Sequence, residues 1–88
     1  MTPLEALRAD LQAVSPASAN EVFTSLFTRG CDALGLNDAQ AAIVFDTSRP
    51  IVSRWRRGVV IPPASNLVLR FLLEEVSRVI TERGQVEG

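Results

Sequence analysis

Apolar residues recur at intervals of three and four along almost the whole chain, a spacing that places them on one side of an α-helix. No segment alternates apolar and polar residues in the way that a half-buried strand does. Proline, glycine and short polar clusters divide the pattern into five stretches, approximately 3–15, 19–34, 38–45, 49–57 and 64–82. The sequence therefore predicts an all-α protein, a compact bundle of about five helices.

Residues that start and stop helices flank these stretches. Side chains suited to capping a helix N-terminus stand at Thr2, Ser18, Asn37 and Ser48. A carboxylate three residues after Thr2 and after Ser18 predicts a capping box at each. Gly35 and Gly58 follow two of the predicted helices, as expected for left-handed C-terminal caps. Gly30 interrupts the second helix, and we expect it to let another helix approach closely.

The last helix holds more apolar residues than a single core-facing stripe uses. We assign the core stripe to Val68, Leu72, Val76 and Val79. The stripe assigned to a second subunit is Leu69, Leu73 and Ile80, joined by Leu4 and Leu11 of the first helix. We therefore expect a homodimer, with residues 1–17 as a dimerisation or packing arm. The alternative is that these stripes cover each other within one chain.

The composition argues against several classes of protein. The chain has 88 residues, enough for one small domain, and contains no His, no Tyr and a single Cys. The commonest general base and metal ligand are thus missing, and we expect no enzyme, no metal site and no cofactor. The apolar run at 59–63 is far shorter than the ~20 residues of a membrane-spanning helix. A lone cysteine suits a reducing compartment, so the expected location is the cytoplasm.

Charge is distributed unevenly along the chain. The formal net charge is −1, all nine basic residues are Arg, and the stretch 47–63 contains no acid. That stretch holds Arg49, Arg54, Arg56 and Arg57. A nearly neutral protein with one cationic segment is predicted to bind a partner through a defined face.

The segment 37–58, NDAQAAIVFDTSRPIVSRWRRG, resembles the Cro/repressor-type (Xre-like) helix-turn-helix family of small phage and bacterial transcription regulators. Ala42 matches the small residue at which the two helices cross, Val52 the apolar residue facing it, and Trp55 a core position beneath the motif. The resemblance implies a lambda-repressor-like fold with residues 18–83 as the DNA-binding domain. We expect residues 84–88 to form a disordered tail.

The resemblance also implies roles for the second helix of the motif. Arg49, Pro50 and Arg54 correspond to the residues that contact base edges. The residues expected to contact phosphate are Ser48, Ser53, Arg56 and Arg57. The chain departs from the family at the turn, where Asp46 replaces the usual Gly and Thr47 follows it. It also departs at Asp38, where an acid replaces a phosphate-contacting Gln.

These features predict a sequence-specific, dimeric transcriptional regulator that binds palindromic sites in double-stranded DNA. The alternative is a protein-interaction module of the antitoxin or antirepressor type, which binds a partner protein through its apolar terminal helices. The chain offers no separate ligand domain, so no small-molecule ligand is expected, and no membrane association is expected.

Overall fold

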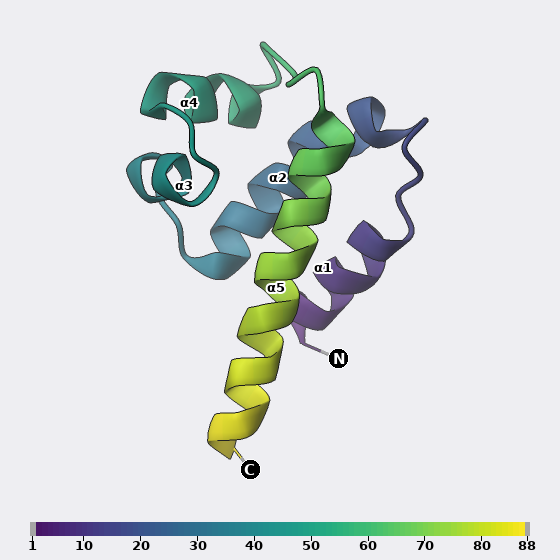
Figure 1. The fold of residues 1–88 in the computed structure, drawn as a ribbon, viewed down its shortest axis with the longest axis vertical. Helices are drawn as coiled ribbons and strands as arrows, with labels where there is room; N and C mark the ends of the chain where they lie inside the picture. The colour runs from purple at the N-terminus through teal and green to yellow at the C-terminus, as the bar shows by residue number, and fades with distance from the viewer. Residues whose placement is uncertain (1, 88) are drawn as a thin grey trace.

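The computed structural model describes residues 2–87, with side chains described as far as Arg83. Figure 1 shows α1 (Pro3–Gln12), α2 (Ala19–Leu34), α3 (Asp38–Val44), α4 (Arg49–Arg57) and α5 (Ser65–Glu87). None of the described residues forms a strand. The prediction of an all-α bundle of about five helices is confirmed.

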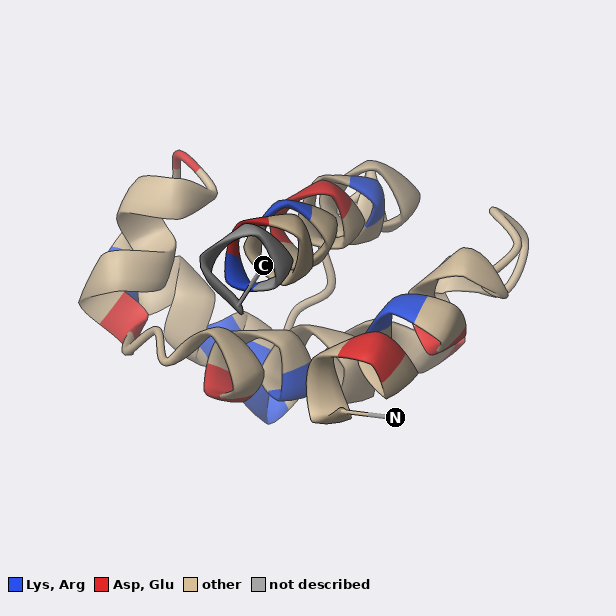
Figure 2. Cartoon of the chain, turned by 90° about the horizontal axis from the view of Figure 1, so that it is seen from below, with Lys and Arg blue, Asp and Glu red and all other residues tan. Residues whose placement is uncertain are grey.

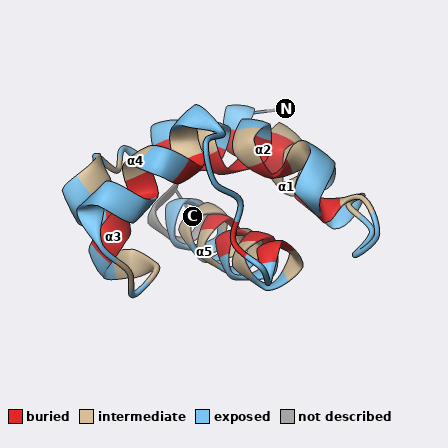
Figure 3. Cartoon of the chain, turned by 90° about the horizontal axis from the view of Figure 1, so that it is seen from above, coloured by how far each residue is buried: buried red, intermediate tan, exposed pale blue. Residues whose placement is uncertain are grey.

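Helix α5 is the element around which the others are arranged. It packs against α2 along one side and against α1 along another, while α4 packs on α2 and α3 packs on α4. In Figure 3 the buried positions of α1, α2 and α4 lie on the sides of these helices that face α5. A single core therefore connects the N-terminal helix to the α3–α4 pair.

Aromatic side chains form the centre of this core. The rings of Phe23 and Phe27 on α2 stack with centroids 5.3 Å apart. The indole of Trp55 meets both rings edge-on, at 5.8 Å and 5.4 Å. Phe27 also contacts Phe45, which follows α3, at 5.1 Å. Edge-to-face and stacked pairs of this kind stabilise by about 0.5–1.5 kcal/mol beyond the area they bury, so they hold α4 firmly on α2.

The N-terminal helix belongs to the same core and is not a separate arm. Leu4, Leu7 and Leu11 are all buried within the chain, against α2 and α5. Leu69 is buried beside them, and Leu73 and Ile80 are partly buried against the same cluster. The assignment of Leu4, Leu11 and Leu69 to a subunit interface is therefore wrong, whereas Leu73 and Ile80 keep part of their surface exposed and their assignment stays a prediction. The structure agrees with the alternative, in which the apolar residues of the first and last helices cover each other within one chain.

The physical reason lies in how many neighbours α5 has. Because α1 and α2 both lie against it, α5 needs a wider apolar face than a helix with one neighbour. The buried line of α5 is Ser65, Leu69, Leu72 and Val76, and Val68 is only partly buried. The predicted core stripe was thus misplaced at its N-terminal end.

Helix ends follow local rules with three exceptions, one of which is that α1 ends at Gln12 and not near residue 15. The Thr2–Glu5 capping box is present, with both hydrogen bonds at 3.1 Å. Ser18 does precede α2, but its hydroxyl donates to the Ser15 carbonyl at 3.2 Å and caps no amide. The third exception is α5, whose backbone stays helical to Glu87, past the predicted end near residue 82. The structure thus gives helical backbone as far as Glu87 where the sequence predicted a disordered tail from residue 84, and Gly88 lies outside the described residues.

Gly30 lies where α2 approaches α5 closely. A Cβ atom added to Gly30 would lie 2.6 Å from both Cδ atoms of Leu72, which is itself fully buried. Any larger residue at position 30 would therefore force Leu72 to move, which agrees with the close helix approach expected at Gly30. No described helix is both long enough and apolar enough to span a bilayer.

Candidate nucleic-acid interface

Helices α3 and α4 are joined by a tight turn that depends on Asp46. This residue has φ of 52°, the left-handed region, which Asp tolerates because its short polar side chain can hydrogen-bond locally. The turn is closed by the Thr47 amide, which donates to the Ala42 carbonyl at 2.9 Å. Ala42 is buried, which allows α4 to cross close to α3. Asp46 thus adopts at this turn a backbone conformation that glycine adopts more readily than other residues.

The N-termini of both helices are capped as predicted. The Asn37 carboxamide accepts from the Gln40 amide at 2.8 Å, and the Gln40 side chain accepts from the Asn37 amide at 3.0 Å. The Ser48 hydroxyl accepts from the Ile51 amide at 3.4 Å. The hydroxyl of Ser48 thus serves first as the cap of α4, and the residue is exposed at the molecular surface.

The orientation of α4 is set by two buried residues on one side. Val52 and Trp55, at i and i+3, face the core, as predicted. Pro50, Arg54 and Arg57 follow at i, i+4 and i+7 on the opposite side, and all three are exposed. The helix therefore presents a line of one proline and two arginines outward.

The remaining positions of α4 lie between these two faces. Arg49 is exposed at the first turn, and Ser53 is half-buried. Ile51 lies at the rim of the buried face and is 37% exposed. Arg49 can therefore contribute to the exposed face of α4. Only part of the Ser53 side chain is accessible on that face.

The exposed arginines Arg49, Arg54 and Arg57 form no ion pair among the described residues. Nε of Arg57 donates to the Ser53 carbonyl at 3.4 Å, within α4 itself. Elsewhere the charges are mixed: Figure 2 shows acidic and basic positions interspersed along α5 and α1. Arg29 pairs with Asp10, and Arg78 pairs with Glu75 and Glu82. Uncompensated positive charge is thus concentrated on the exposed side of α4.

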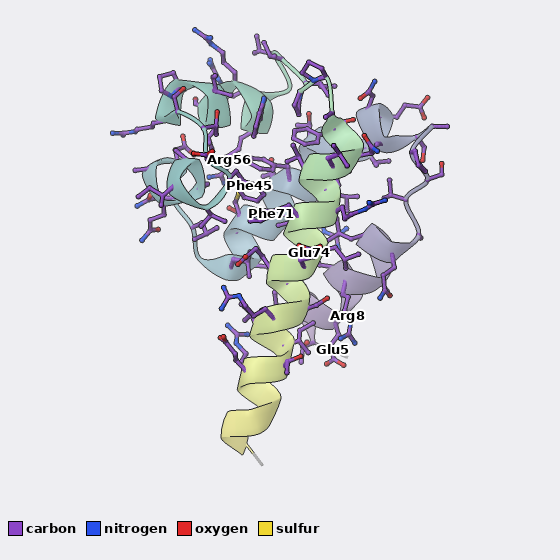
Figure 4. The ribbon with its side chains drawn as sticks, in the orientation of Figure 1. Glu5, Arg8, Phe45, Arg56, Phe71 and Glu74 are labelled. Atoms are coloured by element: carbon purple, nitrogen blue, oxygen red, sulfur yellow. The ribbon has the colours of Figure 1, made fainter. Side chains whose placement is uncertain are left out.

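Arg56 differs from the other arginines of α4. Its Nη2 lies 2.6 Å from Asp32 Oδ1, its Nη1 lies 3.1 Å from Asp38 Oδ1, and its side chain is only 25% exposed. Figure 4 shows Arg56 in the region between α4 and α3. Partial burial alone would lower the pKa of Arg56, but the hydrogen bond that its guanidinium donates to Asp38 and the negative charge of Asp32 raise the pKa instead. The structure thus engages Arg56 within the protein, and we no longer place it among the phosphate contacts.

Cys31 lies in the core beneath these helices. Its side chain is fully buried, and burial raises the pKa of the thiol to about 11. The thiol therefore stays protonated at neutral pH and behaves as a small apolar group. No cluster of three or more potential metal ligands occurs among the residues that the structure describes.

A second surface was not identified from the sequence. Leu67 and Phe71 are one turn apart on α5 and are 54% and 38% exposed. Figure 4 shows Phe71 beside Phe45, and their rings lie 5.4 Å apart. The segment joining α4 to α5 adds the exposed residues Val59, Val60 and Ile61. The surplus of apolar residues on the last helix was the sequence feature that could have indicated this surface. That surplus does not show which of the apolar residues are exposed.

No protein-family model, curated protein or solved structure matches this chain. The two features that distinguish its surface are the exposed arginines of α4 and the exposed apolar residues around the α4–α5 connection.

Proposed function

We propose that this protein is a sequence-specific DNA-binding transcriptional regulator, with α3, the turn at Asp46 and α4 acting as a helix-turn-helix. The observation that carries this proposal is the division of α4 into two faces. Val52 and Trp55 anchor the helix on the core, and the opposite face presents Arg54 and Arg57 without neutralising acids. A helix of this kind fits the major groove of B-DNA, where arginine is the commonest specific contact.

In this proposal Arg49, Pro50 and Arg54 contact base edges. Each guanidinium can donate two parallel hydrogen bonds to O6 and N7 of a guanine, which discriminates against a wrong base by about 1–3 kcal/mol. Pro50 has no amide donor and offers an apolar contact to a thymine methyl group. Arg57, at the C-terminal end of the exposed line, contacts phosphate, together with the hydroxyl groups of Ser48 and Ser53.

We also propose that the protein acts as a homodimer, through a surface that differs from the one the sequence suggested. We call this surface the α4–α5 apolar patch; it comprises Val59, Val60, Ile61, Leu67 and Phe71. The segment 58–69 contains no charged residue. In a two-fold dimer the same patch faces itself, so an uncharged surface avoids opposing like charges. Because the patch begins directly after α4, such a dimer would present two α4 helices to the half-sites of a palindrome.

The α4–α5 apolar patch also favours the second candidate, a protein-interaction module of the antitoxin or antirepressor type. In that case a different protein would cover the patch, and DNA binding would be absent or secondary. The two candidates differ in what α4 does, so DNA binding separates them.

The test begins with selection of bound sites from random duplex DNA by the wild-type protein. We expect a palindromic site with half-sites about one helical turn apart. On that site, Arg54→Ala should cost about 1–3 kcal/mol of binding free energy and relax one position per half-site. Arg57→Ala should weaken binding to all sequences alike and reduce the salt slope by about one per monomer.

The matched control is Arg78→Ala on α5. Arg78 is exposed but pairs with Glu75 and Glu82 within the same helix, so its loss should leave both affinity and salt slope unchanged. Failure to enrich any site, or equal and negligible effects of Arg54→Ala and Arg57→Ala, would remove the DNA-binding proposal and leave the protein-interaction module.

A further inference from the structure

The side chain of Arg56 connects three helices at one point. Nη2 lies 2.6 Å from the Asp32 carboxylate near the C-terminal end of α2, and Nη1 lies 3.1 Å from the Asp38 carboxylate at the first residue of α3. The Thr28 hydroxyl of α2 also donates to the Arg56 carbonyl at 3.5 Å. The C-terminal half of α4 is thus linked by polar contacts to α2 and, through Arg56, to α3.

Other ion pairs in the described part of the chain are arranged differently. Arg78 also pairs with two carboxylates, but Glu75, Arg78 and Glu82 all belong to α5, so the pairs join no separate elements. Arg29 joins α2 to α1 through one carboxylate, that of Asp10. Arg56 is also less exposed than Arg29 and Arg78, with 25% of its side chain accessible against 44% and 56%. A partly buried pair is screened less by salt and holds its geometry better than an exposed one.

The two carboxylates are also a problem for a DNA-binding surface. Both carboxylates pair with Arg56, which directly precedes the exposed Arg57 in α4, so without this pairing their negative charge would act on a segment proposed to meet phosphate. Arg56 supplies one positive charge between them and cancels part of their repulsion. A planar guanidinium can reach two carboxylates at once, which an ammonium group does with poorer geometry.

We infer that Arg56 is a positioning residue of the proposed DNA-binding surface, which acts through Asp32 and Asp38 and makes no contact with DNA. It holds α4 at a fixed angle to α2 and α3 and neutralises the acids beside the exposed arginines. This inference rests on the proposed function, because it assigns to one residue of α4 a role distinct from base and phosphate contact.

Arg56→Lys tests the inference with a change that preserves the charge. If Arg56 contacted a phosphate, Lys would replace it with little loss, because Lys also binds phosphate well. If Arg56 bridges two carboxylates, Lys should lower affinity for the selected duplex by roughly 3- to 10-fold, the effect of about one weakened charge pair. The salt slope should equal that of the wild type, since no phosphate contact is lost.

A second experiment removes the charge of Arg56. It compares the single variant Arg56→Met with the triple variant that combines Arg56→Met, Asp32→Asn and Asp38→Asn. The single variant should bind less tightly with an unchanged salt slope, and the neutral triple variant should recover most of the lost affinity because the bare carboxylates are gone. Arg78→Met, which also leaves two carboxylates unpaired but far along α5, is the control and should not change affinity. Trp55 fluorescence and circular dichroism establish that each variant is folded. If Arg56→Met does not fold, the affinity and salt slope of Arg56→Lys still test the inference.

The possible outcomes distinguish a failure of the inference about Arg56 from a failure of the proposed DNA-binding function. If the wild-type protein selects no DNA site, the proposed function fails and the inference fails with it. If the wild type binds but Arg56→Lys keeps full affinity, or Arg56→Met lowers the salt slope by about one without recovery in the triple variant, Arg56 contacts phosphate directly. In that case only the inference is overturned.

Discussion

Raising the pH from 8 to 11 should destabilise this protein through one buried thiol. Cys31 is fully buried, and burial raises the pKa of its thiol from an ordinary value of about 9 to about 11. Between these two values the unfolded chain loses the proton while the folded protein retains it. Stability from the protonated thiol is therefore fully present below about pH 9 and is lost as the pH rises toward 11. Two pKa units correspond to about 2–3 kcal/mol of unfolding free energy.

The composition of the chain makes this effect measurable. It contains no Lys, no Tyr and no His, so no other side chain has an ordinary pKa between pH 8 and 11. Urea unfolding followed by the fluorescence of the single Trp55 would give the free energy of unfolding at each pH. The control is Cys31→Ala, whose stability should be lower at the outset but nearly independent of pH between 9 and 11.

Two results would refute this reasoning. One is an identical pH profile for the wild type and Cys31→Ala, which would mean that the thiol has the same pKa in the folded and unfolded states. The other is reaction of the native thiol with a disulfide reagent at pH 8 at the rate of a free cysteine, which would mean that Cys31 is accessible.

Three further predictions concern packing. Trp55→Ala should lower the free energy of unfolding by about 3–5 kcal/mol, because it removes a buried indole that meets two other rings; an unchanged thermal melt would show that the indole does not stabilise the core. Gly30→Ala should cost about 1–3 kcal/mol by forcing Leu72 to move, and urea titration of the double variant with Leu72→Ala should show a loss smaller than the sum of the two; strict additivity would contradict the close approach. Leu67→Glu should remain folded and sediment as a monomer, whereas Leu69→Glu should unfold; a wild-type protein that is monomeric at hundreds of micromolar would contradict the proposed dimer.

Local sequence rules were sufficient where the interacting groups are close along the chain. The Thr2 and Asn37 caps and the left-handed Gly35, Asp46 and Gly58 are all determined by contacts within a few residues. Ser18 shows the limit of such rules, because the Ser15 carbonyl, also close in sequence, takes the hydroxyl instead of the expected amide. The burial of Val52 and Trp55 was likewise predictable, since the apolar residues of this short helix, Ile51, Val52 and Trp55, lie on one side of it.

Only the tertiary structure decided which apolar residues of α5 are buried. Leu67 and Leu69 are chemically identical and two residues apart, yet Leu67 is 54% exposed and Leu69 is 3% exposed. The difference arises because α1, some sixty residues earlier in the chain, packs along the side of α5 that carries Leu69. Helical periodicity shows which apolar residues share one side of α5. It does not show which side of α5 another helix will cover.

The same distinction holds for the arginines of α4. Their sequence places four of them in an acid-free segment, and nothing local separates Arg56 from Arg57. Arg56 is neutralised by Asp32 and Asp38, which lie 24 and 18 residues away and come within reach only after α2, α3 and α4 have packed. The sequence by itself determined the approximate extent of α2, α3 and α4 and which side of α4 is anchored. Packing decided which charges remain free to meet a partner, because ion pairs between helices form only in the folded chain.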